Sequence, residues 1–497
     1  MGFRYVFVLV RFEISHKLYK LRCLTSTHVH WPSVTDPIQL ANVGPCLADK
    51  ESAVGRLGRD LKMTEIEESM ITGITILGAW IGSFLSARPA THFGYRRVLL
   101  FNNVFWIAGA ALCVIPHLAP IYVGRFLIGL AVGVASTIPP ILLSELSPAN
   151  LRGAITSLHQ LMVTIGILVA GCIGYGFVTS VDHGWKYVLA ANALFSLLTL
   201  PFSRYIVESP VWLVRNERRD DAYRLLLPNR PSADAVSDEL TQIAQELESE
   251  RNLASVSWRE VFNARKAMII GLGLMFFQPM SGINAVIFYS TKIFGFAGVE
   301  NEFLATVLVG CVNVVTTIVS MWLVECLGRR TLLLGGTGVC TVALAALGSV
   351  LLAMNKYQTT QGILAVIFTL VYIVGFAVGL GAVSWVVMSE VMPNRLRAKA
   401  MSAFLMEAWF WNFFVALFTL PTIRLIGGGD DDDHRKKGVG ILLSIFCGVC
   451  LLGVLFIAGY LFETKGLSSD EIQMKLGTKS SINMSPDGPS DGLLEQP

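Results

Sequence analysis

Uncharged amide side chains stand inside long apolar stretches of this chain, where a polar group is costly unless it has a partner. They belong to Gln160, Gln278, Asn284, Asn313 and Asn412, and the hydroxyl of Ser281 joins them. An amide both donates and accepts hydrogen bonds, so several amides around one cavity would suit a neutral, hydroxyl-rich solute. Tryptophans in the same stretches, at 385, 409 and 411, offer flat faces on which a pyranose ring would stack. A hydrogen bond between two helices explains any single amide equally well, and only the whole set favours a solute site.

Two charged side chains, Arg125 and Glu407, also lie inside apolar stretches. A charge in hydrocarbon is expensive, so such residues are candidates for function. For Arg125 we favour a structural or gating role over contact with a solute. For Glu407 three interpretations stay open: pairing between helices, a proton-coupled site, and a position at the membrane interface.

A motif of eight residues occurs twice. ELSPANLR (145–152) and EVMPNRLR (390–397) share their Glu, Pro, Leu and Arg at the same positions. Each copy follows two apolar spans after a basic pair, Arg96-Arg97 in the first case and Arg329-Arg330 in the second. The agreement of motif and span order predicts two duplicated halves, related as parallel repeats in transporters are.

The charged residues of this repeat fall at span ends where two helix bundles would meet. Ion pairs there would lock these ends while a site faces out, and would break as the site opens inward. The alternative is a snorkelling helix end or a plain topology signal, and the duplicated spacing favours the latch. Its predicted members are Glu145, Arg152, Glu325, Arg329, Arg330, Glu390 and Arg397.

The elements that must position these residues are membrane spans. Of the 497 residues 53% are hydrophobic and 15% are charged, against about 45–50% and about 25% in an ordinary soluble domain. The net charge of +3 is too small, and the basic residues too dispersed, for a nucleic-acid binder. The nine cysteines lie mostly in apolar runs and are interpreted as packing residues. Eleven stretches are long enough to span a bilayer: 69–90, 98–119, 121–143, 158–180, 185–206, 267–288, 303–326, 332–354, 363–387, 401–424 and 439–462.

The sequence therefore predicts an all-α polytopic membrane protein. Its expected parts are an atypical N-terminal segment (1–68), an N-terminal bundle (69–206), a helical linker domain (207–266), a C-terminal bundle (267–462) and a tail (463–497). Basic residues gather in the short loops on one side, which places the linker domain and the C-terminus in the cytoplasm. We expect the plasma membrane as the location.

Two features of the halves stand out. Pro279, close to Gly282 within a span, is expected to break the helix, as broken helices mark binding sites in transporters. The first half lacks a counterpart of span 267–288, because Val6–Val10 is too short to cross a bilayer. Either this is an atypical eleven-span protein, or residues 1–60 do not belong to the working protein.

Seven motifs together resemble the sugar porter family of the major facilitator superfamily, the glucose-transporter group, over about residues 58–467. They are Gly124-Arg125-Phe, the run 145–153, Leu158-His-Gln160, Glu208-Ser-Pro210-x-Trp-Leu213, Gln278-x-x-Ser-Gly-Ile-Asn284, Gly328-Arg-Arg330 and Glu463-Thr-Lys-Gly466.

The resemblance implies a major facilitator fold in which two bundles rock around a central hexose site. It also implies the latch above, and sugar contact at Gln160, Gln278, Asn284, Asn313, Trp385 and Asn412. The chain departs from the family pattern at four places. Pro279 replaces a glutamine, Ala377 an acidic residue and Val211 an arginine, and the motif around Tyr95 lacks an acid and one arginine.

We expect a facilitative monosaccharide transporter, with a hexose, first of all glucose, as its solute. A proton-coupled symporter, in which Glu407 would carry the proton, is one alternative. A sugar sensor without transport, or an inactive truncated product, is the other. The motifs indicate no enzyme, cofactor or metal site, and the expected partners are a sugar and the lipid bilayer.

Overall fold

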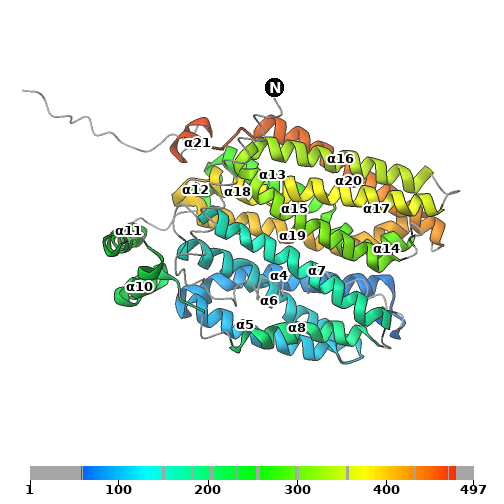
Figure 1. Ribbon diagram of the computed structural model, residues 1–497, viewed down its shortest axis with the longest axis horizontal. Coiled ribbons are helices and arrows are strands. Elements are labelled where there is room, and N and C mark those ends of the chain that lie inside the picture. Colours follow the sequence, from blue (N-terminus) through cyan, green and yellow to red (C-terminus); the bar gives the residue numbers. More distant parts are fainter. Residues whose placement is uncertain are drawn as a thin grey trace, which may run out of the picture.

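Long helices parallel to one another make up most of the chain (Figure 1). The computed structural model describes residues 57–476, apart from short gaps at 59, 148–151, 181–182, 202–205, 231, 253–257, 297–298, 300, 354–357, 430 and 468. The expectations for residues 1–56 and for the tail beyond 476 lie outside the described residues.

The predicted spans are helical. The helices are α4 (Glu65–Phe93), α5 (Tyr95–Cys113), α6 (Leu118–Leu146), α7 (Arg152–Ser180), α8 (Trp185–Thr199), α13 (Arg265–Met280), α14 (Ile283–Phe296), α15 (Glu302–Leu327), α16 (Arg329–Ala353), α17 (Gln358–Phe376), η3 (Ala377–Gly381), α18 (Val383–Val391), α19 (Asn394–Gly427) and α20 (Asp432–Tyr460). Within the described ranges they supply nine spans that are long and apolar enough to cross a membrane. The other two predicted stretches form α5 and α8, of 19 and 15 residues.

Helices α4–α8 lie together in one half of the molecule and α13–α20 in the other (Figure 1). The halves touch where α4 packs on α19 and α7 packs on α15. In the first of these contacts the ring of Trp80 lies 5.9 Å from the ring of Phe410. This arrangement of helices, without a strand in the described residues, confirms the predicted fold class.

Glycines set the spacing between helices inside each half. A Cβ on Gly129 would lie 2.2 Å from the Thr75 carbonyl oxygen, and one on Gly82 would lie 2.3 Å from the Leu130 carbonyl oxygen, so α4 and α6 touch through their backbones. In the second half a Cβ on Gly336 of α16 would lie 2.6 Å from Cα of Gly379 in η3. Small residues are what lets membrane helices approach in this way.

A smaller group of helices projects from one end (Figure 1). It contains α9 (Pro210–Arg215), α10 (Arg219–Leu226), η2 (Leu227–Asn229) and α11 (Ala233–Asn252). At the same end α12 (Trp258–Asn263) packs against α13 and α19 of the second half, and α21 (Ser469–Leu476) lies nearby. The amphipathic pattern of α11 buries Val236 and Leu240 against Trp212 and Leu226.

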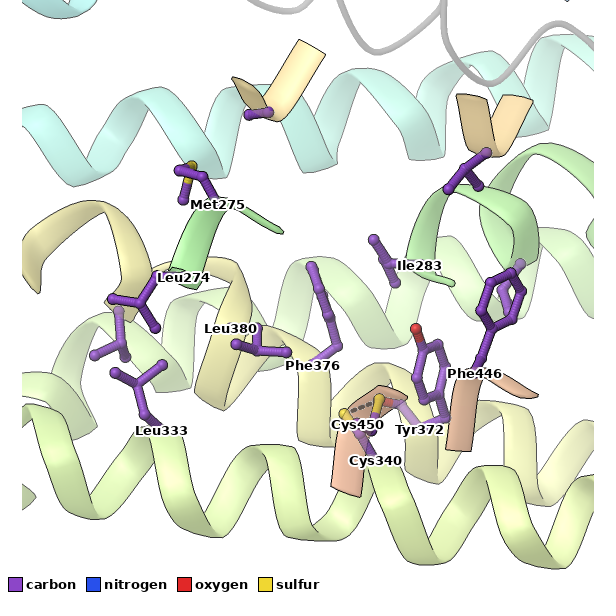
Figure 2. Close-up of a cluster of buried hydrophobic side chains, with 14 of the residues drawn as sticks. Leu274, Met275, Ile283, Leu333, Cys340, Tyr372, Phe376, Leu380, Phe446 and Cys450 are labelled. Atoms are coloured by element: carbon purple, nitrogen blue, oxygen red, sulfur yellow. Dashed lines mark hydrogen bonds between the residues drawn. The ribbon is translucent and has the colours of Figure 1, made fainter. Parts of the chain in front are cut away.

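The first span of the second half is broken, as Pro279 predicts. Helix α13 ends at Met280 and α14 begins at Ile283. Between them Gly282 has φ +90°, a conformation that favours glycine, and a Cβ there would lie 2.4 Å from the ring of Phe446. In the view of Figure 2, Tyr372 lies between the ring of Phe446 and the sulfur pair Cys340 and Cys450.

Candidate functional site

The helix break brings two of the predicted amides together. Asn284, on the first turn of α14, donates a hydrogen bond from Nδ2 to Oδ1 of Asn412 on α19. Asn412 in turn donates from Nδ2 to the Ala408 carbonyl over 2.9 Å. Both side chains are half-buried. The two amides therefore form one polar point between helices that are otherwise apolar.

Backbone carbonyl groups at the break accept hydrogen bonds from nearby hydroxyl groups. The hydroxyl of Tyr372, which is fully buried, donates to the Ser281 carbonyl over 3.1 Å. The hydroxyl of Ser281 donates to the Gln278 carbonyl over 2.8 Å. These bonds replace the helical ones that Pro279 and Gly282 remove, so the position of Asn284 is fixed by its surroundings.

The other predicted solute contacts lie on separate helices. Gln160 (α7), Gln278 (α13) and Trp385 (α18) are half-buried, and Asn313 (α15) is buried. In the described part of the chain, no hydrogen bond joins these four side chains to Asn284 or Asn412. The structure thus brings one pair of the predicted set into direct contact.

The two charged residues inside spans have different surroundings. Arg125 is fully buried, and its three side-chain nitrogens have no hydrogen-bond partner among the residues described. Glu407 accepts a hydrogen bond at Oε1 from Trp411 Nε1 over 3.4 Å. Its second oxygen is buried without a partner in the described chain. The ring of Trp411 packs edge-on against Phe276 at 4.9 Å and does not lie as a free platform.

The predicted latch is partly visible in the second half. Arg329 Nη2 lies 2.9 Å from Oε1 of Glu390, and both side chains are mostly buried. The second oxygen of Glu390 accepts from the Thr464 hydroxyl over 2.6 Å. Because α16 and α18 both belong to the second half, this ion pair lies within one half. The interpretation from the sequence placed such pairs between the halves.

Glu463 closes this cluster from the backbone side. Its carboxylate accepts the backbone N–H groups of Arg329 (2.8 Å), Arg330 (3.1 Å), Thr464 (3.1 Å) and Lys465 (3.0 Å). Partial burial favours the neutral acid, but these four donors outweigh it and hold the pKa of Glu463 below its ordinary value. The carboxylate thereby caps the start of α16, where unpaired N–H groups and the helix dipole favour an anion.

The first half repeats this arrangement with other residues. Glu208 accepts the backbone N–H groups of Tyr95 (2.8 Å) and Arg96 (3.3 Å) at the start of α5. Ser209 donates its hydroxyl to Glu145, as Thr464 does to Glu390. Both glutamates stand in motifs noted in the sequence, but their capping role was not predicted. The signal was the acid followed by a hydroxyl residue after the last span of each half, Glu208-Ser209 and Glu463-Thr464.

The remaining latch residues are less defined. Arg330 donates from Nη2 to the Ala458 carbonyl over 3.0 Å, which ties the start of α16 to the end of α20. The side chains of Arg152, Glu325 and Arg397 lie outside the described residues. Arg230, which precedes α11, pairs with Glu239 and donates from Nη1 to the Leu146 carbonyl over 3.4 Å, so the projecting helices are attached to the end of α6.

Comparison with known proteins identifies the family. The family model described as sugar (and other) transporter matches residues 36–476. The chain belongs to the sugar transporter family. It is 31% identical to plastidic glucose transporter 4 of Arabidopsis thaliana over 432 residues, which cover 85% of this chain and 76% of that protein. It is also 31% identical to the glucose transporter GlcP of Staphylococcus epidermidis (strain ATCC 12228 / FDA PCI 1200) over 426 residues, or 84% and 90% of the two chains.

Solved structures agree with this sugar transporter fold. The xylose transporter XylE from E. coli, in a partially occluded inward open conformation, superposes with a TM-score of 0.74 at 23% identity, covering 88% of this chain and 98% of that chain. The resemblance inferred from the motifs is confirmed, as is the major facilitator fold. Family and fold are those of membrane transporters, and sugar transport is the function they support.

Proposed function

We propose that this sugar transporter carries a monosaccharide, a hexose with glucose as the first candidate, by alternating access and without ion coupling. The observation that supports this best is the Asn284–Asn412 pair beside the helix break. A sugar hydroxyl both donates and accepts hydrogen bonds, so it can replace either amide as partner of the other. Glucose transporters among the relatives support the choice of hexose.

Gln278, Asn313 and Trp385 are proposed as further contacts because α13, α15 and α18 pack against α14 or α19. Gln160 is proposed because it carries the same amide group and its helix, α7, packs on α15. Ala377 lies in η3 and is buried, so it offers no polar group to a solute. We propose that its methyl group, with Pro279, shifts the preference among sugars relative to family members that carry polar groups there. Polyol transporters among the relatives make a linear polyol the next solute to test.

The ion pair of Arg329 and Glu390 supports a specific part in the cycle. It fastens α16 to α18 at one end of the second half. We propose that it lets that half move as a rigid body, while pairs that involve Arg152 and Arg397 hold the two halves together. Because basic residues gather in the short loops at this end, we propose that it faces the cytoplasm and that the protein lies in the plasma membrane.

Uptake of radiolabelled glucose into cells that lack their own sugar transporters tests the proposal. We expect saturable uptake that unlabelled hexoses inhibit and that an ionophore leaves unchanged. Surface biotinylation must show the protein in the plasma membrane. If protein at the surface shows no saturable uptake, transport of glucose is contradicted. If only xylose or polyols compete, one of these is the substrate in place of glucose.

A proton-coupled symporter is the second candidate, and one observation favours it. Glu407 lies within a span, and one of its carboxylate oxygens has no partner in the part of the chain described. Carboxylates inside spans are costly and occur in the proton relays of transporters. Loss of uptake on addition of a proton ionophore, together with insensitivity of E407Q to that ionophore, would establish coupling and exclude simple facilitation.

A further inference from the structure

Helix α12 exposes two aromatic side chains next to each other. Trp258 is 47% exposed and Phe262 is 55% exposed, and their ring centroids lie 6.4 Å apart. The next residue inward, Val261, is fully buried in the core of the second half. The helix is therefore fastened to the protein along one face and presents the aromatic pair on the other.

This pair lies beside the starts of two candidate membrane spans. The span Arg265–Ile287 begins directly after α12, and the span Lys399–Gly427 begins at the same end of the half. Lys399 Nζ lies 5.8 Å from the centre of the Trp258 ring, so α12 touches the start of both spans. Tryptophan beside lysine or arginine is typical of the headgroup layer, where an aromatic body meets lipid and a polar tip meets water.

The charge around the pair is positive. Arg259, Arg265 and Lys266 are exposed, and Glu260 is the one acid within α12. Arg265 and Lys266 form no ion pair in the residues that the structure covers. Phosphate is the anion that such a basic cluster beside a span attracts from a bilayer.

We propose that α12 is an interfacial anchor for anionic lipid. Trp258 and Phe262 insert into the leaflet at this end, and Arg265, Lys266 and Lys399 bind the phosphate of an anionic headgroup. In the orientation proposed above this is the cytoplasmic leaflet, where anionic lipids are concentrated. The lipid would hold the linker helices to the second half whichever sugar is carried, so the anchor does not depend on the choice of solute.

Quenching of Trp258 by brominated lipids tests this directly. The full chain is reconstituted in bilayers that contain either brominated phosphatidylglycerol or brominated phosphatidylcholine. The signal of Trp258 is the difference in fluorescence between the native chain and W258F. We expect lipid to quench it, with a binding constant for phosphatidylglycerol well above that for phosphatidylcholine.

Two double variants distinguish a lipid site at α12 from a general effect of positive charge on lipid binding. R265Q/K266Q should lower the preference for phosphatidylglycerol by roughly ten- to thirtyfold, since each basic residue near the surface contributes a factor of about five. R96Q/R97Q removes an exposed basic pair at the same end of the first half and should leave the Trp258 signal unchanged. Quenching of the other tryptophans reports whether each variant is folded and inserted.

Three results would overturn the proposal. If neither lipid quenches Trp258, α12 lies away from the bilayer. Equal binding of the two lipids, or a preference that R265Q/K266Q leaves intact, would remove the headgroup site. Displacement of the lipid by soluble glycerol phosphate would show a site for free phosphate, whereas failure to displace it supports the membrane lipid.

Discussion

Tyr95 occupies in the first half the position that Arg329 occupies in the second. Each follows a glycine of positive φ, Gly94 at +95° and Gly328 at +89°. Each donates its backbone N–H over 2.8 Å to a glutamate from the end of its own half. The backbone arrangement is thus shared, but only Arg329 adds a charge to the neighbouring carboxylate.

This difference predicts unequal effects of two substitutions. R329Q leaves the mostly buried carboxylate of Glu390 without its cation and should lower the free energy of unfolding by about 2 kcal/mol. Y95F removes one hydroxyl near Glu145, and the loss should stay below about 1 kcal/mol. Thermal unfolding in detergent measures both, and equal losses would contradict the assignment of the ion pair.

The capping role of Glu463 predicts a dependence on pH. Its pKa in the folded protein lies below the ordinary 4.5, so its contribution to stability is complete above that pH and is lost as the pH falls through the lowered value. E463Q should therefore be less stable than the native chain at neutral pH, and the difference should shrink below about pH 4.5. A difference that stays constant on acidification would exclude an ionised cap. E463D serves as a control that keeps the charge.

Close packing between α4 and α6 predicts a steric effect at Gly129. The added Cβ of G129A would lie 2.2 Å from a backbone oxygen, which is unable to move without shifting α4. We expect a loss of about 1–3 kcal/mol, as for other overpacked sites. G335A is the matched control, because among the described residues its new Cβ has no atom within 4 Å other than the neighbouring backbone of its own helix. A G129A protein as stable as G335A would contradict the contact.

The amide pair predicts coupled effects on transport. N284A and N412A should each weaken the apparent affinity for the sugar about fivefold, the equivalent of one hydrogen bond of about 1 kcal/mol. The double variant should lose less than the product of the two, since residues that share a ligand are not independent. Uptake at several sugar concentrations measures this. Independent effects would place the two amides at separate sites.

Much of the fold was predictable because hydrophobic length is a strong signal. The spans, the broken helix at Pro279 and the amphipathic helix α11 each follow from residue types that leave the backbone few alternatives. The boundaries of α5 and α8 were less accurate, because apolar residues continue past the point where each helix ends. The family itself was evident from the motifs, and its model matches residues 36–476.

The sequence indicated which residues belong to the candidate site better than it indicated which of them touch. Asn284 and Asn412 stand 128 positions apart, and only the packing of α14 on α19 decides that they meet. The partners of Glu390 show the same limit. Thr464 and Arg329 lie far from it in the chain, and the motif that contains Glu390 names neither. The capping role of Glu208 and Glu463 was not predicted, although their motifs were noted, because their partners are backbone N–H groups, which residue types do not reveal.

The π-helical turn at Ala377–Gly381 has a geometric consequence for the span that contains it. A π turn accommodates one residue more than an α turn, and one residue rotates a helix by about 100°. Every side chain after Gly381 is therefore turned by roughly a quarter circle from the direction that α17 alone would give it. Deletion of a single residue from this turn would leave the 33-residue span Thr359–Val391 almost as long as before. It would nevertheless rotate α18 about its axis and turn Glu390 away from Arg329. This short turn therefore sets the rotation of α18 relative to α17.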